Sequence, residues 1–148
     1  FVKQRVDGVE LELLVRPVKK LSITANYTYT GGDEKTQSRK STNDTTYNYL
    51  LRRPKSSFNL NTGYQFTKGL YAAISARAVG DRYDVGGYQK EDVRLKNYFL
   101  LGLYAEYNWK DRFRFFLDAQ NLTNTRFFDL RGYNSIPFLV NAGVTFSW

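Results

Sequence analysis

Hydrophobic and polar residues alternate along most of this chain. Within residues 9–15, for example, Leu11 and Leu13 fall on one side and Glu10 and Glu12 fall on the other. A period of two that is maintained over about eight residues is the pattern of a β-strand. The pattern predicts no helix and seven strands, at residues 9–15, 21–29, 58–66, 70–79, 98–109, 112–120 and 138–148.

The predicted strands are long, and their two sides differ in polarity. Strands of soluble proteins usually have about 5–6 residues, whereas a tilted strand that crosses a membrane needs about 9–11. Most of the predicted strands reach that length, and one side of each is almost wholly apolar. An outer-membrane barrel turns the apolar side toward lipid, and a soluble β-sandwich turns it inward. Alternation alone therefore fits both architectures.

The connections and the aromatic residues distinguish the two architectures. Residues 17–20, 67–69 and 110–112 form tight turns, whereas residues 30–48, 81–97 and 121–137 form long loops, all at the same end. Outer-membrane barrels have short periplasmic turns and long extracellular loops. Aromatic residues gather near both ends of the strands, where a barrel wall meets the lipid headgroups. We therefore predict an all-β transmembrane antiparallel β-barrel rather than a sandwich whose core is filled by aromatics.

The composition excludes most catalytic and metal-binding classes. The 148 residues include no Cys, His or Met, which removes thiol nucleophiles, His general bases, zinc clusters and His-ligated haem. Glu10 and Glu12 share a face, but a solvated lumen wall accounts for them better than a catalytic pair does. The spacing of Asp81, Asp84 and Asp92 fits no known calcium cage. We expect no enzyme activity, no cofactor and no metal site.

The net charge of +8 favours anionic partners. A basic face interleaved with aromatics can bind single-stranded nucleic acid, but here Lys and Arg lie at the two ends of the strands. A soluble nucleic-acid module, recognisable by steep salt dependence, is therefore an alternative that we do not favour. On the loop side, Arg39 and Lys40 are candidates for pairing with lipopolysaccharide phosphates. Because a charge facing lipid costs about 2–4 kcal/mol near the bilayer centre, Arg77 is assigned to the polar face.

The number of strands indicates an incomplete barrel. Complete single-chain bacterial barrels have an even number of strands, and open strand edges in lipid cost several kcal/mol for each unpaired backbone group. The chain also begins with Phe1 rather than Met. We expect it to be completed by a separate polypeptide or by a missing segment. The alternative is an eighth strand within residues 45–57, which would give a small closed barrel acting as an adhesin or anchor.

The C-terminus carries a more specific signal. It resembles the assembly signal of outer-membrane proteins, in which a polar residue and a glycine precede two aromatic residues at alternate positions. Alternation places the two aromatics on the lipid side, and the glycine leaves room for close pairing. The residues of this predicted barrel-assembly signal are Asn141, Gly143, Phe146 and Trp148.

Several segments in order resemble TonB-dependent outer-membrane receptors. Residues 121–138 ("NLTNTRFFDLRGYNSIPF") are similar to the last extracellular loop of that family, and "GVELEL", "LSITANYTYT", "RRPKSSFNL" and "GDRYD" precede it at the family's spacing. The resemblance implies that residues 1–148 are the last seven strands of a 22-stranded barrel in the bacterial outer membrane. The plug domain and the TonB box would lie in the remainder of the receptor. Implied partners are that remainder, TonB and a surface lipoprotein.

Within that family, the order "RRPK", "GDRYD", "RGYN" most resembles the cobalamin receptors. This resemblance implies active uptake of a scarce, bulky corrinoid, with ferric siderophore or haem receptors of the same fold as the alternative. Many family members carry Gly-Arg before the final strand, where this chain has Pro-Phe. In cobalamin receptors, the Arg aligned with Arg52 and an aromatic residue in the loop after "GDRYD" contact the corrinoid. Tyr88 is the best match for that aromatic residue here. The candidate ligand-binding residues are Arg52, Tyr83, Tyr88, Arg131 and Tyr133.

Overall fold

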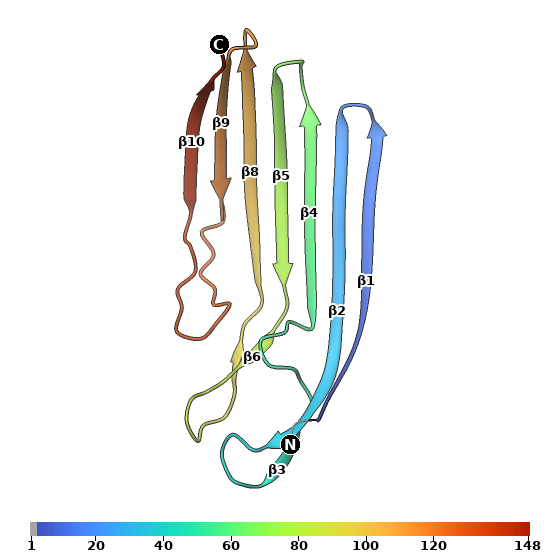
Figure 1. Ribbon diagram of the computed structural model, residues 1–148, viewed down its shortest axis with the longest axis vertical. Helices are drawn as coiled ribbons and strands as arrows, with labels where there is room; N and C mark the ends of the chain where they lie inside the picture. Colours follow the sequence, from blue (N-terminus) through green and yellow to red (C-terminus); the bar gives the residue numbers. More distant parts are fainter. Residues whose placement is uncertain (1–2) are drawn as a thin grey trace.

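A computed structural model describes residues 3–148, which form one large antiparallel sheet, a separate two-stranded hairpin and no helix (Figure 1). Seven long strands follow one another in the order β1-β2-β4-β5-β8-β9-β10. The predicted fold class and the number of long strands are confirmed. No described helix is long and apolar enough to cross a membrane. The long strands are β1 (Lys3–Val18), β2 (Leu21–Gln37), β4 (Ser56–Gln65), β5 (Leu70–Val79), β8 (Tyr98–Trp109), β9 (Phe113–Gln120) and β10 (Leu139–Phe146).

Two strands extend further than the alternation predicts. β1 has 16 residues and β2 has 17, so the first half of the predicted loop at residues 30–48 is in fact strand. Beyond Tyr29, β2 leaves β4 and pairs instead with a short strand, β3 (Asp44–Tyr47). A Cβ on Gly32 would lie 2.1 Å from the carbonyl oxygen of Arg5. Glycine is therefore needed for the close approach of β1 and β2 in this extension.

The described residues contain no eighth long strand. β3 is the only strand within residues 45–57 apart from the start of β4, and its four residues pair with β2 alone. Arg52 then adopts a left-handed backbone with φ of 59°, which an extended strand does not allow. β1 and β10 lie at opposite ends of the strand order (Figure 1). The sheet is thus a section of barrel wall with two open edges.

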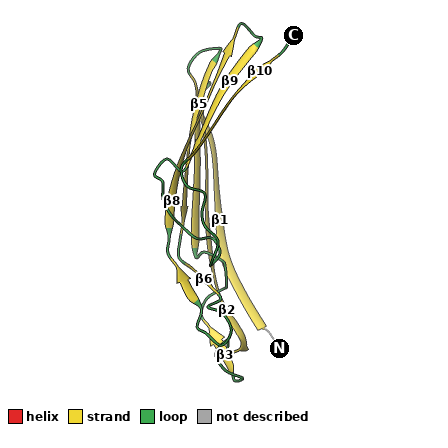
Figure 2. Cartoon of the chain, turned by 90° about the vertical axis from the view of Figure 1, so that its left-hand side faces the viewer, coloured by secondary structure: helices red, strands yellow, loops and turns green. Residues whose placement is uncertain are grey.

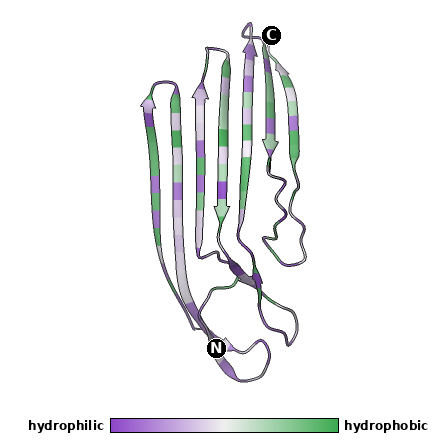
Figure 3. Ribbon diagram, turned by 180° about the vertical axis from the view of Figure 1, so that it is seen from behind, coloured by the Kyte–Doolittle hydropathy of each residue, from purple (hydrophilic) through white to green (hydrophobic). Residues whose placement is uncertain are grey.

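The strand register gives the sheet one apolar face. Tyr27 lies opposite Phe58, Phe58 opposite Ala78, and Ala78 opposite Phe99, which makes a continuous apolar row across four strands. Directly paired residues point to the same side of a sheet. Alternating bands of hydropathy run along the strands in Figure 3. The apolar face is exposed, as at Ile74, which is 56% exposed.

The other face is polar. Asn26 lies opposite Asn59, and Asn59 lies opposite Arg77. Arg77 is therefore on the polar side, as predicted from the cost of a charge in lipid. A hollow of about 530 Å³ opens on this face, and its lining includes Asn26, Asn59, Arg77, Asp118 and Gln120.

Most of the buried residues do not lie at the centres of the strands. They lie in a layer where three long loops pack together. The three loops are the first loop (residues 38–55), the second loop (residues 80–97) and the third loop (residues 121–138), gathered at one end of the sheet (Figures 1 and 2). The second loop contains a small hairpin of β6 (Arg82–Asp84) and β7 (Val93–Leu95). Buried residues in this loop layer are Leu50, Arg82, Asp84, Leu95 and Asn121.

Candidate ligand-binding site in the loop layer

Asp84 joins the three loops. Its side chain, only 2% exposed, accepts hydrogen bonds from Nε of Arg52 in the first loop and from the backbone N–H of Arg131 in the third loop, both at 2.7 Å. The N–H of Val85 donates a third, at 2.8 Å. Burial alone would raise the pKa of Asp84, but these hydrogen bonds outweigh it and hold the pKa below its usual value. Asp84 is therefore charged, and the three hydrogen bonds that its carboxylate accepts connect the three loops.

Arg82 makes a second connection, between the second and third loops. Its guanidinium is buried and donates to the Asp129 carboxylate at 3.0 Å and to the carbonyl of Phe128. The hydroxyl of Tyr98 donates to the same Asp129 oxygen at 2.8 Å. The ring of Tyr98 stacks on Phe127, with centroids 4.1 Å apart. These contacts fix the third loop against the start of β8.

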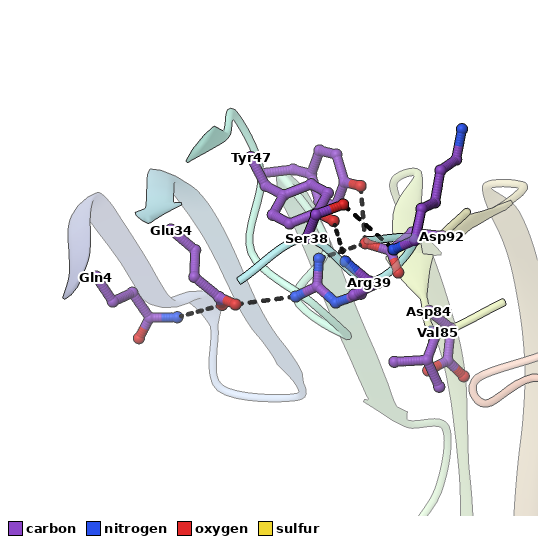
Figure 4. A network of polar contacts seen from close by, with 10 residues as sticks. Gln4, Glu34, Ser38, Arg39, Tyr47, Asp84, Val85 and Asp92 are labelled. Carbon is purple, nitrogen blue, oxygen red and sulfur yellow. Dashed lines mark hydrogen bonds and ion pairs between the residues drawn. The ribbon is translucent and has the colours of Figure 1, made fainter. Parts of the chain in front are cut away.

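Arg39 joins the first loop to the second loop and to β2 (Figure 4). Its guanidinium donates to Asp92 of the second loop at 2.6 Å and to Glu34 of β2 at 2.9 Å, and it lies 4.1 Å from the ring centre of Tyr47. The Tyr49 hydroxyl also donates to Asp92, at 2.8 Å. Burial, and then this hydrogen bond, raises the pKa of Tyr49 far above its usual value. Tyr49 therefore keeps its proton, and can donate to Asp92, at pH values where an ordinary tyrosine would ionise.

The two cations assigned to lipopolysaccharide have carboxylate partners inside the loop layer. Arg39 pairs with Asp92, whose side chain is fully buried, and Lys40 pairs with Glu91. A charge that is already compensated attracts an external phosphate less strongly than a free one. This pair is therefore a weaker candidate for phosphate binding than the sequence suggests.

The structure separates the five candidate ligand-binding residues into two groups. Arg52, Tyr83 and Arg131 are held in the loop layer. The ring of Tyr83 stacks on Tyr49 with centroids 3.9 Å apart, and the Arg131 guanidinium donates to the carbonyl of Gly86. Tyr88 and Tyr133 project outward, with 88% and 71% of their surface exposed.

Tyr133 lies over the polar face of the sheet. It lines a hollow of about 460 Å³ together with Arg77 and Gln120, and both of these residues also line the larger hollow on the polar face. The two hollows are thus contiguous. Together they form a depression that runs from the third loop along the polar face of the sheet.

The described residues hold no cluster of three or more His, Cys, Asp or Glu side chains arranged for a metal ion. The three aspartates weighed as calcium ligands are each engaged by an arginine. The pairs are Asp81 with Arg94, Asp84 with Arg52, and Asp92 with Arg39.

Residues 3–122 match the family model described as TonB dependent receptor-like, beta-barrel. The chain belongs to the TonB-dependent receptor family. A comparison with curated protein sequences gives no match.

Solved receptors of this kind share the fold. The chain is similar to the pyoverdine outer membrane receptor FpvA from Pseudomonas aeruginosa, with a TM-score of 0.79 and 17% identity over 99% of this chain and 22% of that one. The siderophore receptor PiuA from Acinetobacter baumannii gives 0.75 and 23% identity, covering 96% of this chain and 22% of that one. At such identities the likeness shows the fold alone. The chain spans about a fifth of the length of either receptor.

Membership of the TonB-dependent receptor family gives the two faces their orientation. TonB-dependent receptors are transport proteins of the bacterial outer membrane that work with TonB, so the predicted location is confirmed. In such a barrel the apolar face meets lipid and the polar face lines the lumen. The loop layer then lies at the extracellular end, above the two hollows on the polar face.

The residues of the predicted assembly signal occupy both faces of the last strand. Asn141 lies opposite Asp118 on the polar face. A Cβ on Gly143 would lie 2.5 Å from the ring of Phe116, so this glycine lets the aromatic ring cover the backbone of β10. Phe146 packs on Trp148, with ring centroids 6.0 Å apart. Their role in barrel assembly stays a prediction.

The candidate site predicted from the sequence did not include three of the residues that hold the loops together. Arg82, Asp84 and Asp129 are each structural, and their partners are up to 47 residues away in the chain. One signal was available: in "GDRYD", Arg82 and Asp84 alternate with Tyr83. In a short strand this alternation puts two opposite charges on one face, where burial demands a partner for each.

Proposed function

We propose that residues 1–148 form the C-terminal part of an outer-membrane receptor that takes up a scarce, bulky nutrient with energy delivered through TonB. The remaining strands and the plug domain would lie in the rest of the receptor, whether a missing segment or a separate chain. The observation that carries this proposal is the loop layer. It is fixed by ion pairs at Asp84, Arg82 and Arg39, each with at least one buried partner, and it stands above two adjoining hollows on the polar face of the sheet.

The geometry supports capture by a preorganised rim. Loops that are already fixed lose less conformational entropy when they bind a ligand. Tyr88 and Tyr133 are the exposed aromatic side chains of that rim, and aromatic residues commonly dominate binding energy. Arg131 adds a positive charge that has no carboxylate partner among the described residues, and Arg52 is half-exposed but pairs with Asp84. Tyr83 stacks on Tyr49 in the same loop layer. We propose that the ligand is contacted by Arg52, Tyr83, Tyr88, Arg131 and Tyr133.

The nutrient is a corrinoid or a ferric siderophore, and haem is a further alternative. The order of "RRPK", "GDRYD" and "RGYN" motivates the corrinoid. In the structure these three segments meet at Asp84, so their spacing also serves to hold the loops together, whatever the ligand. The exposed cations and tyrosines suit an anionic, aromatic chelate equally well. A surface lipoprotein that docks on the loops is a further proposed partner.

A binding experiment on the complete receptor tests this proposal. Cyanocobalamin and a panel of ferric siderophores would be titrated against the wild type and against Tyr88→Ala and Tyr133→Ala. Because neither side chain holds the loops together, we expect both variants to fold normally and to lose about tenfold or more in affinity for the true ligand. Thr42→Ala, an exposed first-loop change, serves as the control. Wild-type affinity in both tyrosine variants would overturn the site assignment.

Measuring nutrient uptake by cells distinguishes the transport proposal from the alternative of a small barrel that acts as an adhesin or anchor. A self-contained adhesin or anchor barrel would accumulate none of these nutrients. The proposal predicts accumulation of one of them that stops when TonB is removed from the cell. Accumulation that is unchanged without TonB would contradict it.

A further inference from the structure

A basic cavity lies between β7 and the third loop. Its volume is about 410 Å³. Four basic side chains and two phenylalanines contribute to its lining, and no carboxylate does. The six residues are Arg94, Lys96, Arg126, Phe127, Phe128 and Arg131.

Among the described residues, Arg94 alone of the four cations has a carboxylate partner. Arg94 pairs with Asp81, and Arg131 donates to a backbone carbonyl. Within the described chain, neither Lys96 nor Arg126 has a carboxylate within ion-pairing distance. Two like charges that converge on one cavity repel each other unless an anion joins them. The lining therefore favours an anionic group.

The walls of the cavity are fixed. The ring of Phe127 stacks on Tyr98, and the carbonyl of Phe128 accepts a hydrogen bond from the buried Arg82. The ring of Phe127 and the backbone of Phe128 are therefore held in place next to Arg126. A cavity that is already shaped, and that combines apolar walls with a few cations, suits a ligand with a charged head and an apolar body.

The cavity lies at the loop end of the lipid-facing surface. Asn97 contributes to its lining and also to the lining of a separate hollow formed by apolar-face residues, among them Tyr27, Phe58 and Phe99. Thr125, the neighbour of Arg126, lines that second hollow too. The basic cavity thus adjoins the outer end of the apolar face, at the level of the headgroups in the outer leaflet. Through Phe127, which also lines the hollow beneath Tyr133, it adjoins the polar face as well.

We propose that this cavity binds a phosphate group of an outer-leaflet glycolipid, with Lys96 and Arg126 as its cationic contacts. Phe127 and Phe128 would pack against the sugar or acyl portion. This inference rests on the proposed membrane orientation of the chain. It assigns lipid phosphate to cations that are free, rather than to Arg39 and Lys40, which are paired within the loop layer.

The test uses the complete receptor in detergent, titrated with diphosphorylated lipid A, with its dephosphorylated form and with inorganic phosphate. We expect the double variant Lys96→Gln/Arg126→Gln to bind the phosphorylated lipid about 25-fold more weakly. The matched control, Lys19→Gln/Lys20→Gln, removes the same charge from the turn at the opposite end and is expected to bind like the wild type. Dephosphorylated lipid should show no difference between the variants.

Two results would overturn the proposal. One is equal affinity of the double variant and the wild type for the phosphorylated lipid. The other is inorganic phosphate binding as tightly as the lipid, because the cavity would then be a site for a free anion. Nutrient binding and heat-modifiable electrophoretic mobility, measured on the same samples, report separately on receptor function and barrel assembly. A failure of the lipid site is thereby distinguished from a failure of the proposed function.

Discussion

Replacing Ile74 by arginine is expected to destabilise the barrel by about 2–4 kcal/mol, whereas arginine at the next position is tolerated. Ile74 lies in the middle of β5 on the apolar face, opposite Leu103, and is 56% exposed. Ser75 points to the polar face, opposite Asn61 and Gly102. In a membrane the first position meets hydrocarbon and the second meets the aqueous lumen. A guanidinium is costly only where water cannot reach it.

Urea unfolding of the complete receptor in lipid vesicles measures this difference. Ile74→Arg is compared with Ser75→Arg, and Ile74→Leu controls for the change of shape alone. We expect a lower unfolding midpoint, or failure to assemble, for Ile74→Arg only. Equal stability of the two arginine variants, or a larger loss for Ser75→Arg, would show that the faces are assigned the wrong way round.

Removal of the Asp84 carboxylate is expected to loosen all three loops while leaving the barrel wall intact. Asp84→Ala leaves Arg52 and the N–H groups of Val85 and Arg131 without their acceptor. Each polar group left without its partner costs about 1–3 kcal/mol when it is buried, and the half-exposed Arg52 costs less because water reaches it. We therefore expect a local loss of about 2–4 kcal/mol and loss of nutrient binding.

Hydrogen exchange of the loop amides measures this loss. The control is Asp81→Asn, which removes a more exposed ion pair with Arg94 and is expected to change loop protection little. The pKa of Asp84 is lowered in the folded protein, so its stabilisation is present above the pKa of the unfolded state and disappears as the pH falls through the lower, folded value. Wild-type loop protection should therefore decline below about pH 4. If Asp84→Asn showed the same decline, the carboxylate would not be its source.

The sequence predicts the transmembrane part of this fold well because lipid and lumen impose opposite demands on neighbouring residues. That contrast produces the alternation at residues 70–79 and places Arg77 on the polar face. The extension of β2 to Gln37 escapes prediction for the same reason. Beyond Tyr29 both faces of the strand meet water or loops, so backbone pairing continues without any alternation to reveal it.

The sequence names individual residues of the loop layer but not how they are arranged. The sequence singles out Arg52, Tyr83 and Arg131, yet it gives no sign that Asp84 holds the two arginines. Similarly, nothing near Arg39 in the chain identifies Asp92, 53 residues away, as its partner. Ion pairs between loops depend on which loops meet. Local patterns therefore reveal the charges but not their compensation.

The account depends on β5 lying in a barrel wall between lipid and an aqueous lumen. Spin labels placed one at a time at residues 70–79 of the complete receptor in vesicles test this most directly. We predict that even-numbered positions are accessible to oxygen dissolved in lipid, and that odd-numbered positions are accessible to a water-soluble paramagnetic reagent. Protection of the even-numbered positions from both reagents, as in the core of a soluble sandwich, would contradict the account.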